Sequence, residues 1–330
     1  MAKRIGILLG QLGTPDAPTT SAVRRYLRQF LSDRRVVDLN PMLWWLILNG
    51  IILLTRPKKS AELYRNVWTA EGSPLLRITK AQAARLEERL NAEADDVEIR
   101  VEVAMRYGNP STGLAIDTLS AWGAERILLF PMYPQYSAAT TASTCDEVFR
   151  ELSLRRVVPA LRIVPPYYDD PGYIAALAES VREKNTALET KRDKVLISFH
   201  GIPQRYATLG DPYPEHCYAT ADALAKEMGW QSDDYQVTFQ SRFGKEPWLQ
   251  PYTDTTLKQL GAEGVKSVLA LCPGFTADCL ETIDEIGNLG REQFHSTGGE
   301  TLDLIACLND RPRWIDAMSV IVWRELSGWV

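Results

Sequence analysis

The segment Gly123–Pro131 reads GAERILLFP, and a segment of the same pattern, GVKSVLALCP, spans Gly264–Pro273. Each is a short apolar run that ends at a proline, which is typical of a buried strand in a parallel sheet. Two further pairs match in the same order: RYG at 106–108 with RFG at 242–244, and PGYIAA at 171–176 with PRWIDA at 312–317. Three matches in one order indicate that the second half of the chain repeats the first.

Similar apolar runs occur eight times, and each is followed by a turn and then by a stretch of helical composition. They are Arg4–Gly10, Glu98–Met105, Arg126–Phe130, Leu161–Val164, Lys194–His200, Gln236–Gln240, Ser267–Cys272 and Thr301–Cys307. This βα alternation predicts an α/β protein. We expect two similar Rossmann-like lobes, each a four-stranded parallel sheet flanked by helices, with right-handed crossovers.

The repeat also predicts the domain boundaries. Residues 1–166 form the first lobe and 167–310 the second, and the proline-rich segment 163–171 is where the chain crosses between them. We expect the last helix, within 311–330, to pack back on the first lobe. Ligands of such sheets sit beyond the carboxyl ends of the strands, so the site is expected where the two lobes face each other.

Composition excludes several classes of protein. The 330 residues carry 37 Lys plus Arg against 42 Asp plus Glu, a net charge of -5, so nucleic acid is not an expected partner. Five scattered cysteines predict neither a disulfide framework nor a zinc ribbon. The N-terminus lacks a signal-peptide pattern, which predicts a cytoplasmic protein. The apolar segment 41–55 is too short for a membrane-spanning helix.

His200 is the histidine best placed for chemistry. It ends the predicted strand VLISFH and is followed by Gly201-Ile-Pro203, so its imidazole is expected at the carboxyl edge of the second sheet. The alternative is a hydrogen-bonded structural histidine. Imidazole facing carboxylates would suit a divalent transition metal such as iron, and also proton abstraction near neutral pH.

The carboxylates come from the segment CPGFTADCLETIDEI, residues 272–286, which follows the seventh predicted strand. Asp278, Glu281 and Glu285 are spaced i, i+3, i+7, so an α-helix would align them on one face. Acids at a helix start also have a simpler explanation, because they complement the helix dipole and stay solvated. The functional interpretation is favoured because this helix would begin at the same edge of the sheet as His200, so its carboxylates would lie near the imidazole.

Two other segments leave alternatives open. The loop GQLGTP at 10–15 fits neither phosphate-binding pattern, so no nucleotide is predicted. The segment 41–55, PMLWWLILNGIILLT, is either an ordinary buried helix or an exposed lip that binds a large apolar ligand or dips into a membrane interface.

Several motifs resemble those of the ferrochelatases. They are ISFHGIP from Ile197, FQSRFGKEPWLQPYT from Phe239 and CPGFTADCLETIDEI from Cys272, with LLGQLGTPDAP, YLRQFLSDRRVVDLN, EGSPL and FPMYPQYS in the first half. The resemblance spans nearly the whole chain and is closest to the bacterial branch that uses protoporphyrin. It implies a lyase that inserts ferrous iron into protoporphyrin IX to give protoheme, the last step of heme biosynthesis.

The resemblance also implies site residues. His200 and Glu281 would be the catalytic and metal-contacting pair, with Asp278 and Glu285 as a metal or proton route. The Leu12 loop, the lip at 41–55 with Arg56, and Ser73 would border the macrocycle or its propionates. The lip would also face the membrane and place the protein peripherally on its inner face.

Two departures from the family pattern carry predictions. Ala138 stands where some relatives have a cluster cysteine, and no cysteine follows Cys307, so no cofactor beyond the substrate Fe²⁺ and no [2Fe-2S] cluster is predicted. Leu289 stands where the acidic row of some relatives continues. The rival readings are a chelatase for cobalt or nickel, a tetrapyrrole or metal carrier without turnover, and a nucleotide-sugar enzyme, which would need a phosphate loop that is not found.

Overall fold

The computed structural model describes residues 3–188 and 192–330, and its contacts divide the chain into two units. Unit 1 comprises Met1–Tyr133, Ser137–Pro165 and Asp310–Val330, and unit 2 comprises Pro134–Tyr136 and Pro166–Asn309. Each unit contains one four-stranded sheet in which every neighbouring pair of strands is parallel. The predicted fold class is confirmed, and all eight predicted strands are present.

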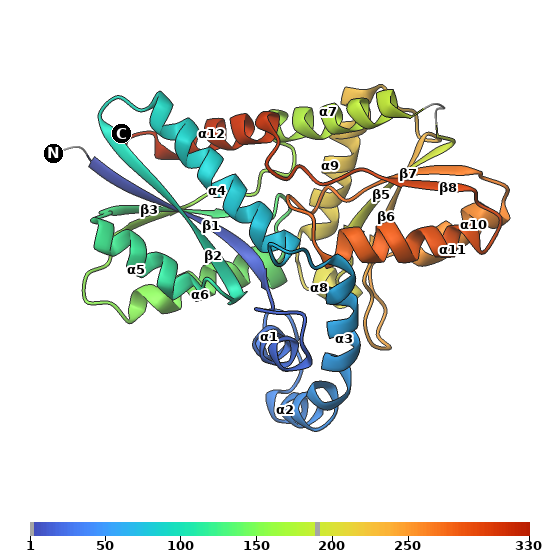
Figure 1. Cartoon of the computed structure of the whole chain (residues 1–330), viewed down its shortest axis with the longest axis horizontal. Coiled ribbons are helices and arrows are strands. Elements are labelled where there is room, and N and C mark those ends of the chain that lie inside the picture. Colours follow the sequence, from blue (N-terminus) through green and yellow to red (C-terminus); the bar gives the residue numbers. More distant parts are fainter. Residues whose placement is uncertain (1–2, 189–191) are drawn as a thin grey trace. The chain divides into compact units, whose positions relative to one another are not determined.

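The sheet of unit 1 has the order β2-β1-β3-β4. Its strands are β1 (Lys3–Thr14), β2 (Val97–Gly108), β3 (Arg126–Pro131) and β4 (Ala160–Ile163). β1 reads KRIGILLGQLGT, and its middle is buried because helices cover both faces of the sheet. α5 (Thr112–Trp122) and α6 (Ser143–Ser153) contact one face, and α4 (Pro74–Glu93) the other (Figure 1).

The C-terminal helix α12 (Pro312–Leu326) lies beside α4 in unit 1 (Figure 1). Glu93 at the end of α4 accepts hydrogen bonds from the Ser319 hydroxyl at 2.6 Å and from the Trp323 indole N–H at 2.7 Å. Trp314 is fully buried. These contacts attach the last helix to the first sheet.

The segment 41–55 forms three helical pieces rather than one buried helix. These are α2 (Pro41–Ile47), the π-helix η1 (Leu48–Ile52) and the start of α3 (Leu53–Val67), and α1 (Thr20–Ser32) precedes them. One side of the segment packs against α1, and its opposite side is exposed. The exposed apolar side chains are Met42, Leu43, Trp45, Leu46, Ile51 and Leu54. Within the described residues, no helix is long and apolar enough to cross a membrane.

The sheet of unit 2 has the order β6-β5-β7-β8, which repeats the order of unit 1 strand for strand. Its strands are β5 (Lys194–His200), β6 (Tyr235–Gln240), β7 (Ser267–Leu271) and β8 (Thr301–Leu304). Its helices are α7 (Pro171–Ala187), α8 (Gln204–Thr208), α9 (Tyr213–Met228), α10 (Thr253–Ala262), the π-helix η3 (Glu281–Gly290) and α11 (Arg291–His295).

β8 ends at Leu304, whereas the sequence predicts a strand to Cys307. The reason is a change of partner. Ile305 N still donates to Ala270 O at 2.8 Å, but Cys307 N donates to the Asp278 carboxylate at 3.2 Å instead of to a strand. The end of the predicted strand is therefore recruited to hold an acidic residue of the candidate site.

The segment Pro134–Tyr136 belongs to unit 2 although both its neighbours in sequence belong to unit 1. Gln135 Nε2 donates to Thr220 Oγ1 at 2.8 Å, and Tyr136 N donates to His216 Nδ1 at 3.1 Å, both on α9. Burial lowers the pKa of His216, which favours the neutral ring that can accept this bond. A further π-helix, η2 (Ala138–Ala142), follows in unit 1.

Candidate active site

His200 occupies the last position of β5, the place predicted for it. Its Nδ1 lies 2.7 Å from the carbonyl oxygen of Gly201, the next residue. A carbonyl oxygen only accepts hydrogen bonds, so Nδ1 carries a proton, and in the neutral ring Nε2 is the nitrogen with the free lone pair. The rings of Trp248 and Phe275 lie 6.4 and 6.5 Å from the imidazole, centroid to centroid. The imidazole thus has two aromatic neighbours, and Nε2 is the nitrogen that is not bonded to Gly201.

The acidic residues do not form the single helical row that the sequence predicts. The helix of residues 281–290 is a π-helix, with i→i+5 hydrogen bonds in place of the predicted α-helical ones, and Asp278 lies outside it. Asp278 is drawn out because its carboxylate accepts from Asn309 Nδ2 at 2.7 Å and from Thr282 Oγ1 at 3.0 Å. Of the three acids in the predicted row, Glu281 and Glu285 lie on η3, which also carries the buried Asp284.

Asp278 is buried and fully engaged in holding the start of η3. Besides the two bonds to its carboxylate already given, Cys307 N donates to it at 3.2 Å, and its own N–H donates to Asn309 Oδ1 at 2.9 Å. Asn309 has a positive φ of 48°, a conformation that asparagine tolerates better than most residues. The contacts of Asp278 are therefore those of an anchor at the start of the helix.

Glu285 is held from the other side by the residue that follows β6. Ser241 N donates to Glu285 Oε1 at 2.7 Å, and Ser241 Oγ donates to Oε2 at 2.5 Å. Gln240 Nε2 adds a longer bond to Oε2 at 3.3 Å and donates to the Glu281 carbonyl at 2.8 Å. Ser241 has a φ of 67°, so this clamp is made in a strained, left-handed backbone conformation.

The charges around Glu285 act in opposite directions. Burial raises the pKa of Glu285, the Ser241 hydrogen bond and a charged His200 lower it, and the charge of Glu281 raises it, with a raised pKa as the result. These interactions show that His200, Glu281 and Glu285 lie within electrostatic reach of one another. A raised pKa brings a carboxyl group closer to the range in which it can exchange protons.

Glu281 comes between the two anchored acids in sequence, and its carboxylate has fewer hydrogen-bond partners. Its carboxylate interacts with the Cys279 thiol, whose pKa is raised well above the ordinary range by burial and then by the charge of Glu281. Among the described residues, no hydroxyl or amide donor is recorded on this carboxylate, in contrast to those of Asp278 and Glu285. The sequence did not single out Ser241, Gln240 or Asn309, the residues that make this difference.

The remaining predicted contacts belong to unit 1. Leu12 lies near the end of β1, Arg56 is exposed on α3, and Ser73 caps α4, where its buried Oγ accepts from Thr14 Oγ1 at 2.9 Å. His200, Glu281, Asp278 and Glu285 belong to unit 2. In the described part of the chain, no three His, Cys, Asp or Glu side chains are grouped closely enough to hold a metal ion.

Comparisons with known proteins identify the family. A family model described as ferrochelatase matches residues 4–326. The ferrochelatase of Idiomarina loihiensis is 49% identical over 328 residues, covering 99% of this chain and 90% of the relative. That of Thioalkalivibrio sulfidiphilus is 51% identical over 329 residues, covering 98% and 88%.

Solved structures of low identity agree in fold alone. SirB from Bacillus subtilis with Fe³⁺ has a TM-score of 0.58 at 13% identity, covering 99% of this chain and 97% of its own. The sirohydrochlorin chelatase SirB in complex with cobalt has a TM-score of 0.54 at 10% identity, covering 99% and 96%. With the family match over almost its whole length, the chain belongs to the ferrochelatase family.

Proposed function

We propose that the site at the end of β5 and the start of η3 carries out the reaction of this family, with His200 as its central base. The protein is a lyase that inserts ferrous iron into protoporphyrin IX and gives protoheme, the last step of heme biosynthesis. The observation that supports the site best is the 2.7 Å contact of His200 Nδ1 with Gly201 O, because in the neutral ring it makes Nε2 the nitrogen that can accept a proton.

The reaction needs both bases and a metal path. A free-base porphyrin carries two inner N–H protons, and both leave when Fe²⁺ binds the four nitrogens. We assign proton acceptance and a first contact with iron to His200. We assign to Glu281 either contact with the metal or the relay of protons. Glu285, with its raised pKa, would pass protons onward, and the anchored Asp278 would act chiefly by fixing the start of η3.

Unit 1 would supply substrate contacts. Leu12, Arg56 and Ser73 are proposed to border the macrocycle or its propionates, because the Leu12 loop, the lip at 41–55 with Arg56, and Ser73 have that role in the family that the chain resembles. Binding energy from the large apolar face of the porphyrin would then hold the ring distorted, so that its nitrogen lone pairs turn toward the metal.

We also propose that the protein is cytoplasmic and rests on the inner face of the membrane through the lip at residues 41–55. The support is its exposed side: Trp45 is 62% exposed and Leu46 60% exposed. Large apolar side chains gathered on one surface segment are typical of interfacial binding. The absence of a [2Fe-2S] cluster stays a prediction from the sequence.

The test is anaerobic mixing of the purified protein with protoporphyrin and Fe²⁺ or Zn²⁺, following the change from free-base to metalloporphyrin absorbance. His200→Ala should abolish insertion and leave porphyrin binding measurable, and Glu281→Gln should lower turnover by orders of magnitude. His295→Ala is the matched control, since His295 is exposed on α11. Near-normal turnover by His200→Ala would remove His200 from the mechanism.

The same assay separates the rival functions. A carrier would bind porphyrin and show no turnover, and a chelatase for another metal would insert Co²⁺ or Ni²⁺ much faster than Fe²⁺. Either result would contradict the assignment to iron insertion.

A further inference from the structure

The outer edge of the unit 1 sheet is strand β2, and side chains of α4 bond its main-chain groups. Asn91 Nδ2 donates to the Ile99 carbonyl at 2.8 Å, and Asn91 Oδ1 accepts from Ile99 N at 3.0 Å. Glu87 Oε2 accepts from Val101 N at 2.7 Å. Exposed strand edges attract other chains, so these bonds protect the edge.

Along α4, all of which the structure describes, no side chain bonds the main chain of β2 at Val103. Outward-facing groups alternate along a strand, so Val103 presents its N–H and C=O to the same side as Val101 and Met105. At Met105 the edge is closed again, because Met105 N donates to Pro110 O at 2.8 Å and Ser111 forms a parallel bridge there. Among the residues that the structure describes, no hydrogen bond on this side reaches Val103 N or O.

The gap follows from the sequence of α4. Asn91 and Glu87 are four residues apart and bond Ile99 and Val101, which are two residues apart. Four helical residues rise about 6.0 Å and two strand residues about 6.6 Å, so the next step of the same ladder brings Ala83 opposite Val103. Alanine has no polar atom with which to bond the strand.

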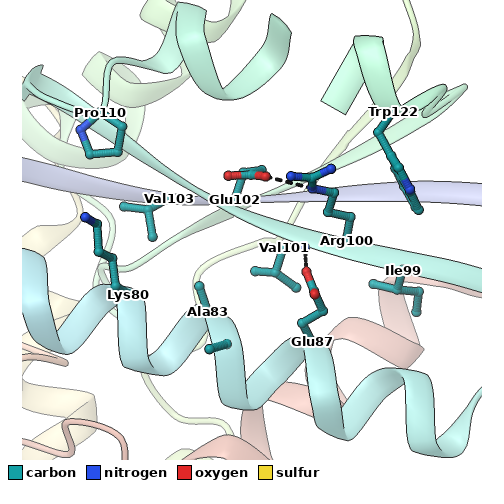
Figure 2. A pocket seen from close by; sticks show the side chains of 11 residues that line it. Lys80, Ala83, Glu87, Ile99, Arg100, Val101, Glu102, Val103, Pro110 and Trp122 are labelled. Carbon is teal, nitrogen blue, oxygen red and sulfur yellow. Dashed lines mark hydrogen bonds and ion pairs between the residues drawn. The ribbon is translucent and has the colours of Figure 1, made fainter. Parts of the chain in front are cut away.

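A cavity of about 510 Å³ lies at this gap, within the usual size of ligand pockets (Figure 2). Its lining includes Lys80, Ala83, Val101, Val103 and Pro110. Figure 2 shows Lys80 on α4 at the Pro110 end of the cavity. Lys80 is exposed, and within the described part of the chain no ion pair is recorded for it.

The other charged groups of the cavity are already engaged. Arg100 Nε pairs with Glu102 Oε1 at 2.8 Å, and Glu87 bonds the strand. Among the described residues that line it, the cavity therefore offers one cation without a recorded ion pair, Lys80, at the end where β2 meets Pro110, and beside it the main-chain N–H and C=O of Val103.

We propose that this cavity binds the C-terminal residues of a partner polypeptide, extended beside β2 and parallel to it, with the terminal carboxylate on Lys80. An extended segment would pair with Val103 N and O as an added strand does. It could not continue past Pro110, because the chain itself occupies the edge there, so the segment must end at that point. A strand parallel to β2 reaches this end with its carboxyl terminus, and the Lys80 ammonium complements that charge.

The experiment uses the full chain and an array of random tetrapeptides, each made with a free C-terminus and again as the C-terminal amide. A subset of the free acids should bind, and their amides should bind about tenfold or more weakly. Lys80→Gln should weaken the free acids about tenfold and remove their advantage over the amides. Equal binding of acids and amides by the unmodified protein would overturn the proposal, as would no binding of any peptide at about 1 mM.

A second variant tests the main-chain part. Ala83→Gln supplies the missing amide opposite Val103 and should reduce peptide binding at least tenfold. Ala92→Gln, an exposed position on the same helix, is its control and should bind as the unmodified protein does. Unchanged binding by Ala83→Gln would contradict strand addition at Val103. Thermal unfolding checks that both variants fold. If Ala83→Gln does not fold, Lys80→Gln still tests the proposal, because Lys80 is exposed and its replacement leaves the fold intact.

Discussion

Ser241 offers a direct test of how the site is built, because one residue both strains the backbone and holds Glu285. Ser241→Ala removes the hydroxyl that donates to Glu285 at 2.5 Å and keeps the φ of 67°. A hydrogen bond to a charged group contributes about 1.5–3 kcal/mol, so the free energy of unfolding should fall by that amount.

Ser241→Gly removes the same hydroxyl and relieves the strain. The left-handed conformation costs a residue with a side chain about 1–2 kcal/mol, and glycine gives back about 0.5–1 kcal/mol through the freedom of the unfolded chain. The glycine variant should therefore be about 0.5–1 kcal/mol more stable than the alanine variant. Equilibrium unfolding in urea at pH 7 measures both.

Activity should not follow that order. Both variants lose the bond that orients Glu285, and the loss of such a supporting contact typically lowers metal affinity or activity by about 10- to 100-fold. We expect kcat/KM for Fe²⁺ to fall equally in the two variants, with the KM for porphyrin unchanged. If glycine is as destabilising as alanine, the strain argument is wrong. If the glycine variant is fully active, Glu285 does not need the Ser241 hydroxyl.

Three further predictions follow from contacts in each unit. The Asp33 carboxylate accepts hydrogen bonds from Arg106 Nη2 at 2.5 Å and from the Tyr107 hydroxyl at 2.7 Å. Burial raises the pKa of Asp33, but its hydrogen bonds and the charge of Arg106 outweigh burial and lower this pKa below 3.8. Its contribution is therefore fully present above pH 3.8 and is lost as the pH falls through the lowered pKa. Asp33→Asn should cost about 3 kcal/mol at pH 7 and progressively less as the pH falls below 3.8, as urea unfolding at several pH values would show. Trp45→Ser combined with Leu46→Ser should weaken binding to lipid vesicles more than tenfold in a sedimentation assay and leave thermal unfolding unchanged, because both side chains are exposed, and unchanged sedimentation would contradict the lip as the membrane contact. Asn309→Ala should lower the free energy of unfolding by about 2–4 kcal/mol through its two lost bonds to Asp278, and a loss below about 1 kcal/mol would show that Asp278 does not depend on it.

Much of the fold was readable from the sequence, because its signals are local. Buried parallel strands need continuous apolar runs, and turns and helices separate them, so segments such as Lys194–His200 could be placed to the residue. The repeat of GAERILLFP in GVKSVLALCP predicted two sheets of the same kind, and the strand orders β2-β1-β3-β4 and β6-β5-β7-β8 agree with that prediction. The position of His200 at a strand end followed from the same pattern.

What the sequence missed depends on contacts between distant residues. An i, i+3, i+7 spacing predicts one helical row, but Asn309, 31 residues away, holds Asp278 outside the helix. The apolar segment 41–55 has the same composition whether it is buried or exposed, and only its packing on α1 decides which side chains stay at the surface.

The sequence by itself therefore determined the elements, their repeat and the residue types of the site, since hydrophobic periodicity and turn chemistry act within a few residues. Only the tertiary structure decided that Asp278 and Glu285 are anchored by hydrogen bonds and that Glu281 is less restrained. That difference comes from Ser241 and Asn309, two non-glycine residues with positive φ. Their left-handed conformations are unfavourable locally and persist because the surrounding hydrogen bonds outweigh the strain, which no local pattern in a sequence can express.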